Sequence, residues 1–235
     1  MRTNFYIDGF NLYKGCIEGT SFKWLNLVEF CRHSFPPPDN ILNRVRYFTA
    51  RVRAWPHDPS QPERQAAYLR ALETLPEISI HYGQFKTSNH WMRLADLRKG
   101  APAVTGGVTR SNWEALTGLP AGTPGMAFVE RSEEKGSDVN LATRLLMDGF
   151  QNDYEAAVVI TNDPDQREPI RLVRQELNKK VVVLFPVRAG RRPSNDLKSV
   201  ASTTHDLDFA LLAACQFPPM VMTAKGRQIR KPAAW

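Results

Sequence analysis

Five short apolar segments, each bounded by turn-forming residues, constrain the fold of this chain most strongly. They are rich in β-branched and aromatic residues and span 4–8, 45–52, 78–82, 156–161 and 180–185. Continuous apolar runs of this length are typical of strands that are buried on both faces of a parallel sheet. We therefore expect these segments to form the centre of the fold.

Helical patterns lie between these segments. Apolar residues recur at helical spacing over 24–32, 62–75, 138–150 and 167–177. A chain that alternates strands with helices is typical of an α/β fold with a parallel sheet. Because crossovers between parallel strands are right-handed, the loops that follow the strands meet at one edge of the sheet. We expect an open parallel sheet with helices on both faces.

Two regions interrupt this rhythm. Residues 84–125 have no clear period and are rich in Gly and Pro, so we expect an insertion or flap at about 84–127. Residues 223–235 are basic and show no regular pattern. We predict one domain over residues 1–215, interrupted by the flap, and a basic C-terminal tail over 216–235.

The composition bears on where the protein works and what it binds. No run approaches about eighteen consecutive apolar residues, so we expect no membrane span, and no signal peptide fits before the first strand. Three cysteines without metal-ligand spacing are typical of reduced thiols in a cytoplasmic protein. The formal net charge of +7 and the pI near 9.5 favour a polyanionic partner, although many basic proteins bind none.

Carboxylates follow two of the predicted strands and begin one of the predicted helices. Asp8 ends the first strand, with Asn11 three residues further on. Asp138 begins a helix, and Asp163 and Asp165 follow the fourth strand. Ligands bind to open parallel sheets beyond the carboxyl ends of the strands, where the strand order reverses. We expect these side chains to converge at that edge.

Several carboxylates in one pocket repel one another unless they are protonated or neutralised. A hard divalent cation resolves this repulsion, because Mg²⁺ and Mn²⁺ prefer carboxylate oxygens and water. The sequence does not decide between one ion and two. Each acid also has a structural interpretation: Asp163 or Asp165 as a helix cap, Asp138 as a first-turn acid and Asp8 as part of a turn.

Four segments carry these residues, in the order FYIDGFNLY, RYFTARV, EEKGSDVNLATRLLMDGF and AAVVITNDPDQREPIRLV. Together they resemble the NYN domain family, a branch of the PIN-like nucleases, over about residues 4–185, and the closing GRQIRKPAAW is similar to the tail of bacterial members. The resemblance implies a Rossmann-like or PIN-like α/β fold and metal-dependent ribonuclease activity. It also implies metal-binding roles for Asp8, Asp138, Asp163 and Asp165.

Three other residues of the resemblance bear on the site. Asn11 would orient a carboxylate or contact the substrate. Relatives often carry an aromatic residue where this chain has Gln166, and Pro164 stiffens the loop between two of the acids. These departures remove no carboxylate, so they affect the expected loop geometry and substrate more than the expected metal binding.

A basic rim is expected around the acidic pocket, because the loops after the second and fifth strands reach the same edge. The candidate nucleic-acid-binding residues are Arg51, Arg53, Trp55, Lys135, Arg188, Arg191 and Arg192. Arginine holds phosphate groups through paired hydrogen bonds, and Trp55, or Trp91 and Trp113 from the flap, could stack on unpaired bases. The structural alternatives are solvated surface charges and packed tryptophans.

The residues and the resemblance together predict a metal-dependent nuclease that hydrolyses phosphodiester bonds, foremost in single-stranded RNA. Its catalytic residues would be Asp8, Asn11, Asp138, Asp163 and Asp165, its cofactor Mg²⁺ or Mn²⁺, and its nucleophile a metal-bound water. Two alternatives stay open: a nucleic-acid-binding module without catalysis, and a small-molecule enzyme that reuses the same pocket. The sequence leaves the choice of RNA or DNA and the oligomeric state open.

Overall fold

The structure is a computed structural model, and it describes residues 1–55, 58–93, 126–188 and 190–235. The chain divides into two compact units. The larger comprises residues 1–85 and 134–235, and the smaller comprises 86–133. The six-stranded sheet, the helices of the described residues and the candidate site discussed below belong to the larger unit.

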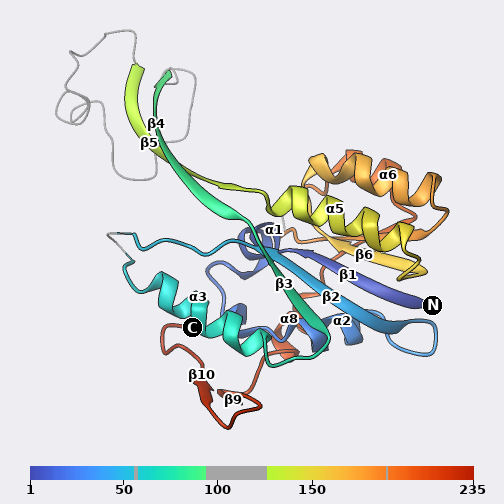
Figure 1. The fold of residues 1–235 in the computed structure, drawn as a ribbon, viewed down its shortest axis with the longest axis horizontal. Coiled ribbons are helices and arrows are strands. Elements are labelled where there is room, and N and C mark those ends of the chain that lie inside the picture. The colour runs from blue at the N-terminus through green and yellow to red at the C-terminus, as the bar shows by residue number, and fades with distance from the viewer. Residues whose placement is uncertain (56–57, 94–125, 189) are drawn as a thin grey trace. The chain divides into compact units, whose positions relative to one another are not determined.

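A six-stranded parallel sheet forms the centre of the larger unit (Figure 1). The strand order is β3-β2-β1-β6-β7-β8, and every neighbouring pair is parallel. The strands are β1 (Arg2–Asp8), β2 (Ile41–Thr49), β3 (Ile78–Tyr82), β6 (Ala156–Ile160), β7 (Lys180–Phe185) and β8 (Thr203–Asp206). This confirms the predicted open α/β fold.

Alternate residues of the central strands face two separate hydrophobic cores, one on each side of the sheet. In β1, Phe5 and Ile7 belong to the first core, whereas Tyr6 belongs to the second. In β6, Val158 belongs to the first core and Val159 to the second. Because both faces are covered, these strands read as continuous apolar runs in the sequence.

The helices cover both faces, as predicted. Residues of α1 (Gly9–Leu12), η1 (Tyr13–Ile17), η2 (Phe22–Trp24), α2 (Leu27–Ser34), α3 (Gln61–Leu72) and α8 (Phe209–Ala214) join the first core. Residues of α5 (Ser137–Phe150), α6 (Arg167–Gln175) and α7 (Asn195–Val200) join the second. A short turn, η4 (Pro164–Gln166), precedes α6. Among the described residues, no helix is both long and apolar enough to cross a membrane.

The structure differs from the expected pattern in two regions. Part of the expected flap is regular, since β4 (Gln84–Arg93) and β5 (Met126–Lys135) pair as a two-stranded sheet, while residues 94–125 lie outside the described residues. The C-terminal segment, expected to be irregular, contains a hairpin of β9 (Met220–Met222) and β10 (Gln228–Arg230). Its turn uses Gly226, whose φ of 73° favours glycine.

Candidate active site at the sheet edge

The strand order reverses between β1 and β6, which are neighbours at the centre of the sheet. The chain continues from β1 to β2 on one side and from β6 to β7 on the other. In open α/β sheets this point leaves a crevice beyond the carboxyl ends of the strands, where ligands bind. Asp8 is the last residue of β1, and Asp163 follows β6.

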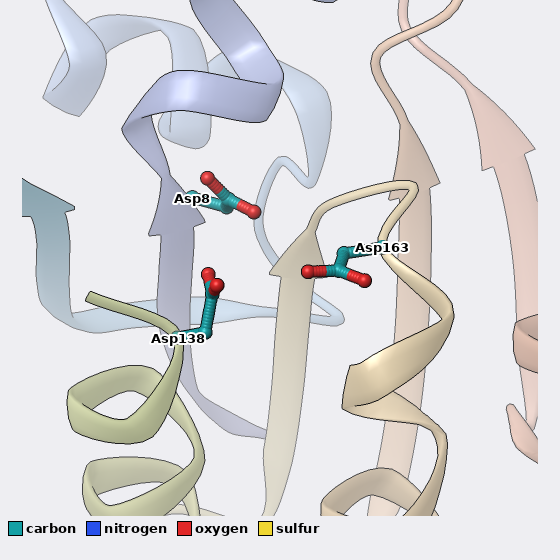
Figure 2. A group of neighbouring side chains, drawn as sticks. All are labelled: Asp8, Asp138 and Asp163. Carbon is teal, nitrogen blue, oxygen red and sulfur yellow. The ribbon is translucent and has the colours of Figure 1, made fainter. Parts of the chain in front are cut away.

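Three carboxylates converge at this point. Asp8, Asp138 and Asp163 each offer one carboxylate oxygen, and these oxygens lie within 4.8 Å of one another. Figure 2 shows the three side chains pointing toward one another from β1, from the first turn of α5 and from the loop after β6. The carboxylate of Asp8 is buried, whereas Asp138 and Asp163 are partly exposed.

Local hydrogen bonds fix the orientation of the Asp8 carboxylate. The backbone amide of Asn11 donates to Oδ1 at 3.0 Å, and its side-chain amide donates to Oδ2 at 2.8 Å. The hydroxyl of Thr161 also donates to Oδ2, at 3.0 Å. Asp8 is therefore the N-cap of α1 and at the same time a member of the acidic group.

Burial and neighbouring negative charges raise the pKa of two of the acids, Asp8 and Asp138. Burial raises the pKa of Asp8, and the charge of Asp163 adds to this effect. Burial also raises the pKa of Asp138 to about 6, with further contributions from Asp8, Asp163, Glu134 and Asp165. In the absence of a cation the site therefore disfavours three full negative charges.

Asp163 has a structural role of its own, and Asp165 lies apart from the group. Asp163 caps the turn η4 by accepting a hydrogen bond from the Asp165 backbone amide at 3.0 Å. The side chain of Asp165 is exposed, and within the described residues the acidic group contains three members, not four. Asp165 still adds to the raised pKa of Asp138.

The sequence prediction gave no supporting role to three residues, although it noted Gln166 as a departure from the NYN pattern. Thr161 contacts Asp8, and its hydroxyl also accepts a hydrogen bond from the Asp163 backbone amide at 3.1 Å. Buried Gln166 donates to the backbone carbonyl of Asp138 at 3.3 Å. Glu134 accepts from the amide of Ser137 at 3.0 Å, next to Asp138. Of these three, only Thr161 has a sequence position that indicates a role at the site, because it is a polar residue that directly follows a buried strand.

The predicted basic rim is mostly exposed. Arg51 lies over the ring of Tyr82, with 4.8 Å between guanidinium carbon and ring centroid. Arg188 donates to the backbone carbonyl of Glu18. The other candidates of the rim are exposed: Arg53, Trp55, Lys135, Arg191 and Arg192. Trp91 belongs to the smaller unit, and Trp113 lies outside the described residues. Nucleic-acid binding by the basic rim and the tryptophans stays a prediction.

The donor set of the acidic group fits a hard divalent cation. Three carboxylates supply oxygen ligands of the kind that Mg²⁺ and Mn²⁺ prefer. Within the described residues the group contains no histidine, so it differs from the two-histidine, one-carboxylate set typical of non-haem iron. Asp8, Asp138 and Asp163 are the residues that would hold the cation.

Comparison with known proteins finds similarity to a protein named as a monooxygenase. It is 28% identical over 254 residues to 6-hydroxy-3-succinoylpyridine 3-monooxygenase HspA of Pseudomonas putida (strain DSM 28022 / S16). The similarity covers 100% of this chain and 75% of HspA. A solved structure of a protein of unknown function from Vibrio parahaemolyticus RIMD 2210633 is 15% identical, with a TM-score of 0.48, covering 88% of this chain and 93% of that one. No family model matches.

The nuclease prediction is therefore wrong, as is the prediction of a metal-dependent ribonuclease as the enzyme class. A relative that aligns over the whole chain bears the name of a monooxygenase, which is an oxidoreductase and not a hydrolase. The physical reason for the error is that a carboxylate group at a sheet edge defines a place for a cation or substrate, but not the bond that reacts there. The resemblance to NYN domains stays a prediction.

A dinucleotide cofactor such as a flavin does not fit this edge. Its pyrophosphate requires backbone amides and open space at a glycine-rich turn, whereas here three carboxylates would repel it. The space beside Gly9 is already filled, since a Cβ there would lie 2.6 Å from the carbonyl oxygen of Phe48 and 2.8 Å from the Tyr47 hydroxyl. This glycine permits the start of α1 to pack closely against the end of β2 instead of forming a phosphate cradle.

Proposed function

We propose that this protein is an oxidoreductase that oxygenates a small substituted aromatic compound at the edge between β1 and β6. The observation that carries this proposal is the similarity to HspA over the full length of the chain. The position of the acidic group supports it, because this edge is where open α/β sheets place their ligands. HspA is named for a substituted hydroxypyridine, so we propose a substrate of that class.

The name of HspA places the new oxygen on C3 of the ring, which carries the succinoyl group and no hydrogen, so the bond between the ring and the acyl carbon breaks in such a reaction. One oxygen atom of O₂ becomes the ring hydroxyl, the other leaves as water, and the acyl group leaves as an aldehyde. Four electrons and four protons balance this step, with two hydride equivalents coming from an external donor of the reduced nicotinamide class. A divalent cation bound to the acidic group would supply Lewis-acid polarisation of an oxygen substituent. Asn11 and Thr161 would keep the Asp8 carboxylate directed into the site through their hydrogen bonds.

We also propose that the protein works in the cytoplasm. Its three cysteines, Cys16, Cys31 and Cys215, are free and buried. Burial raises the pKa of each thiol, which keeps them in the unreactive protonated form. Unpaired structural thiols of this kind are typical of proteins in a reducing compartment.

Oxygen uptake tests the proposal. Purified protein, supplied in turn with Mg²⁺, Mn²⁺ and Fe²⁺, would be mixed with a reduced nicotinamide and a panel of hydroxypyridines that includes 6-hydroxy-3-succinoylpyridine. We expect substrate-dependent oxygen consumption matched by oxidation of the donor. Asp163→Asn should lose this activity, whereas Asp39→Asn should keep it, because Asp39 is exposed and precedes the start of β2, which pairs with the end of β1 opposite to Asp8. Absence of oxygen uptake from the wild type under all these conditions would contradict the proposal.

A further inference from the structure

A cavity of about 150 Å³ lies on the face of the sheet that carries α2 and α3, within the larger unit. It is bounded by α1 and η1, by the end of β2, and by α3. Its wall combines buried side chains such as Leu12 and Leu25 with partly exposed ones such as Phe22 and Lys23, so the cavity reaches the surface. The acidic group does not contribute to this wall.

The size and the lining of the cavity suit one aromatic ring. Six aromatic side chains face it: Phe10, Tyr13, Phe22, Tyr47, Tyr68 and Trp235. A cavity of about 150 Å³ with apolar walls is large enough to bind benzene, as an engineered cavity in another protein shows. Aromatic side chains favour an aromatic ligand because rings pair in edge-to-face and offset arrangements.

Most polar groups of the wall are already engaged. Arg64 forms an ion pair with Asp58 and donates to the Ser60 hydroxyl at 2.5 Å. The side-chain amide of Gln65 forms two hydrogen bonds with the backbone. Its nitrogen donates to the carbonyl of Ala50 and its oxygen accepts from the amide of Val52, both at 2.9 Å. These groups hold the wall in place and leave little capacity for a ligand.

Lys23 is the exception. It lines the cavity, is partly exposed, and has no hydrogen bond or ion pair with any residue that the structure describes. Since Asp58 offsets the charge of Arg64, the side chains of the wall carry one excess positive charge, on the ammonium group of Lys23. A ligand that fills the cavity and neutralises this charge needs an aromatic body and an anionic substituent.

We propose that this cavity binds a monocyclic aromatic carboxylate, with the ring among the six aromatic side chains and the carboxylate directed to Lys23. The cavity is a neighbour of the reaction site, because Gly9 and Phe10 of its wall directly follow Asp8 in the chain. That the bound compound is also the substrate rests on the proposed function. The binding itself does not.

Fluorine NMR with 4-fluorobenzoate as the probe, and neutral 4-fluorobenzamide as its comparison, tests this proposal. We expect saturable binding of the benzoate to the wild type. Lys23→Met keeps the length of the side chain and removes its charge, so it should weaken benzoate binding about fivefold or more and leave benzamide binding within about twofold. The matched control Lys225→Met changes an exposed lysine in the β9–β10 turn and should leave both unchanged.

A second variant tests the location of the ligand. Val52→Trp adds volume to a partly exposed position of the wall and should abolish binding of both probes, provided that circular dichroism shows an intact fold. The proposal is overturned if the wild type binds no benzoate, if Lys23→Met leaves benzoate binding unchanged, or if folded Val52→Trp still binds it. Benzoate binding without any oxygen uptake would refute the proposed function and leave the cavity assignment standing.

Discussion

The hydroxyl of Thr161 donates a hydrogen bond of 3.0 Å to the carboxylate of Asp8 and so joins the ends of two neighbouring strands, β6 and β1. The same hydroxyl accepts a bond from the backbone amide of Asp163. One side chain therefore fixes the positions of two of the three acids. We expect the geometry of the acidic group to depend on this residue.

Thr161→Val tests that dependence, because valine keeps the β-branched shape of a buried residue and removes the hydroxyl. Loss of a residue that orients a metal ligand weakens metal binding about ten- to hundredfold. We expect Mn²⁺ affinity, measured by isothermal titration calorimetry, to fall within this range. Thr203→Val is the matched control, since Thr203 is exposed on the edge strand β8. Equal Mn²⁺ affinity in wild type and Thr161→Val would contradict the role of the hydroxyl.

Asp138→Asn should stabilise the cation-free protein at neutral pH. The folded-state pKa of about 6 lies above the ordinary value of 3.8, so ionisation of Asp138 lowers the free energy of unfolding as pH rises through this interval. The full difference corresponds to about 3 kcal/mol, and partial exposure reduces our expectation to about 1 kcal/mol. This predicts a Tm about 2–4 °C higher.

The same variant should respond differently to a cation. Mn²⁺ should raise the Tm of the wild type and have a much smaller effect on Asp138→Asn, because binding to the folded state alone stabilises it. Asp39→Asn, which changes an exposed aspartate, should behave as wild type in both respects. A lower Tm for cation-free Asp138→Asn would show that the acids do not repel one another in solution.

His81 should make the protein less stable as pH falls from about 6.5 to 4. Burial, together with the charges of Arg46 and Arg144, lowers the pKa of His81 to about 4. The unfolded chain therefore takes up a proton in this interval that the folded protein does not, so stability is fully present above pH 6.5 and declines below it. After allowance for the partial exposure of the ring, we expect a loss of about 1–2 kcal/mol.

Urea denaturation at several pH values, on wild type and His81→Gln, measures this contribution. The variant should lose less stability than the wild type between pH 6.5 and 4, since glutamine does not titrate. The exposed His33 provides the control, because His33→Gln should keep the slope of the wild type. Parallel pH profiles for wild type and His81→Gln would refute the assignment.

Asp148→Ala should destabilise the fold severely. Asp148 is 3% exposed, and it accepts hydrogen bonds from Arg46 at 2.5 and 2.8 Å and from the Tyr6 hydroxyl at 2.7 Å. Its removal leaves the guanidinium of Arg46 without its buried partner, which costs about 3–5 kcal/mol. Glu168→Ala, which breaks the exposed pair with Arg171, should cost much less, because solvent screens this pair. Urea denaturation compares the two, and similar losses would contradict the difference in burial.

The sequence predicted the central strands well for a physical reason. β6 and β7 are packed on both faces, so apart from Lys180 their residues are apolar, and many are β-branched, a pattern with few alternatives. The edge strand β8 has one neighbour and reads Thr-Thr-His-Asp, which carries no such pattern. The three-residue strands β9 and β10 are too short to show any period.

The acidic group was predictable in part. Convergence of Asp8, Asp138 and Asp163 follows from the rule that parallel strands end at one edge. The exposed position of Asp165 depends on the turn at Pro164, which spacing alone does not determine. The cavity was beyond prediction, because its wall draws on residues from Gly9 to Trp235 that only the fold brings together. The reaction also could not be predicted from the sequence, because the same group of carboxylates can support many different reactions.

Incorporation of ¹⁸O from labelled O₂ into product tests the central claim most directly. Wild type, Asp163→Asn and Asp39→Asn would be incubated with a reduced nicotinamide, a divalent cation and 6-hydroxy-3-succinoylpyridine, and the products analysed by mass spectrometry. The proposed function predicts one labelled oxygen atom in the product of the wild type and of Asp39→Asn. It predicts that Asp163→Asn gives at least about a hundredfold less of this product. Absence of labelled product from the wild type, or full labelling by Asp163→Asn, would contradict it.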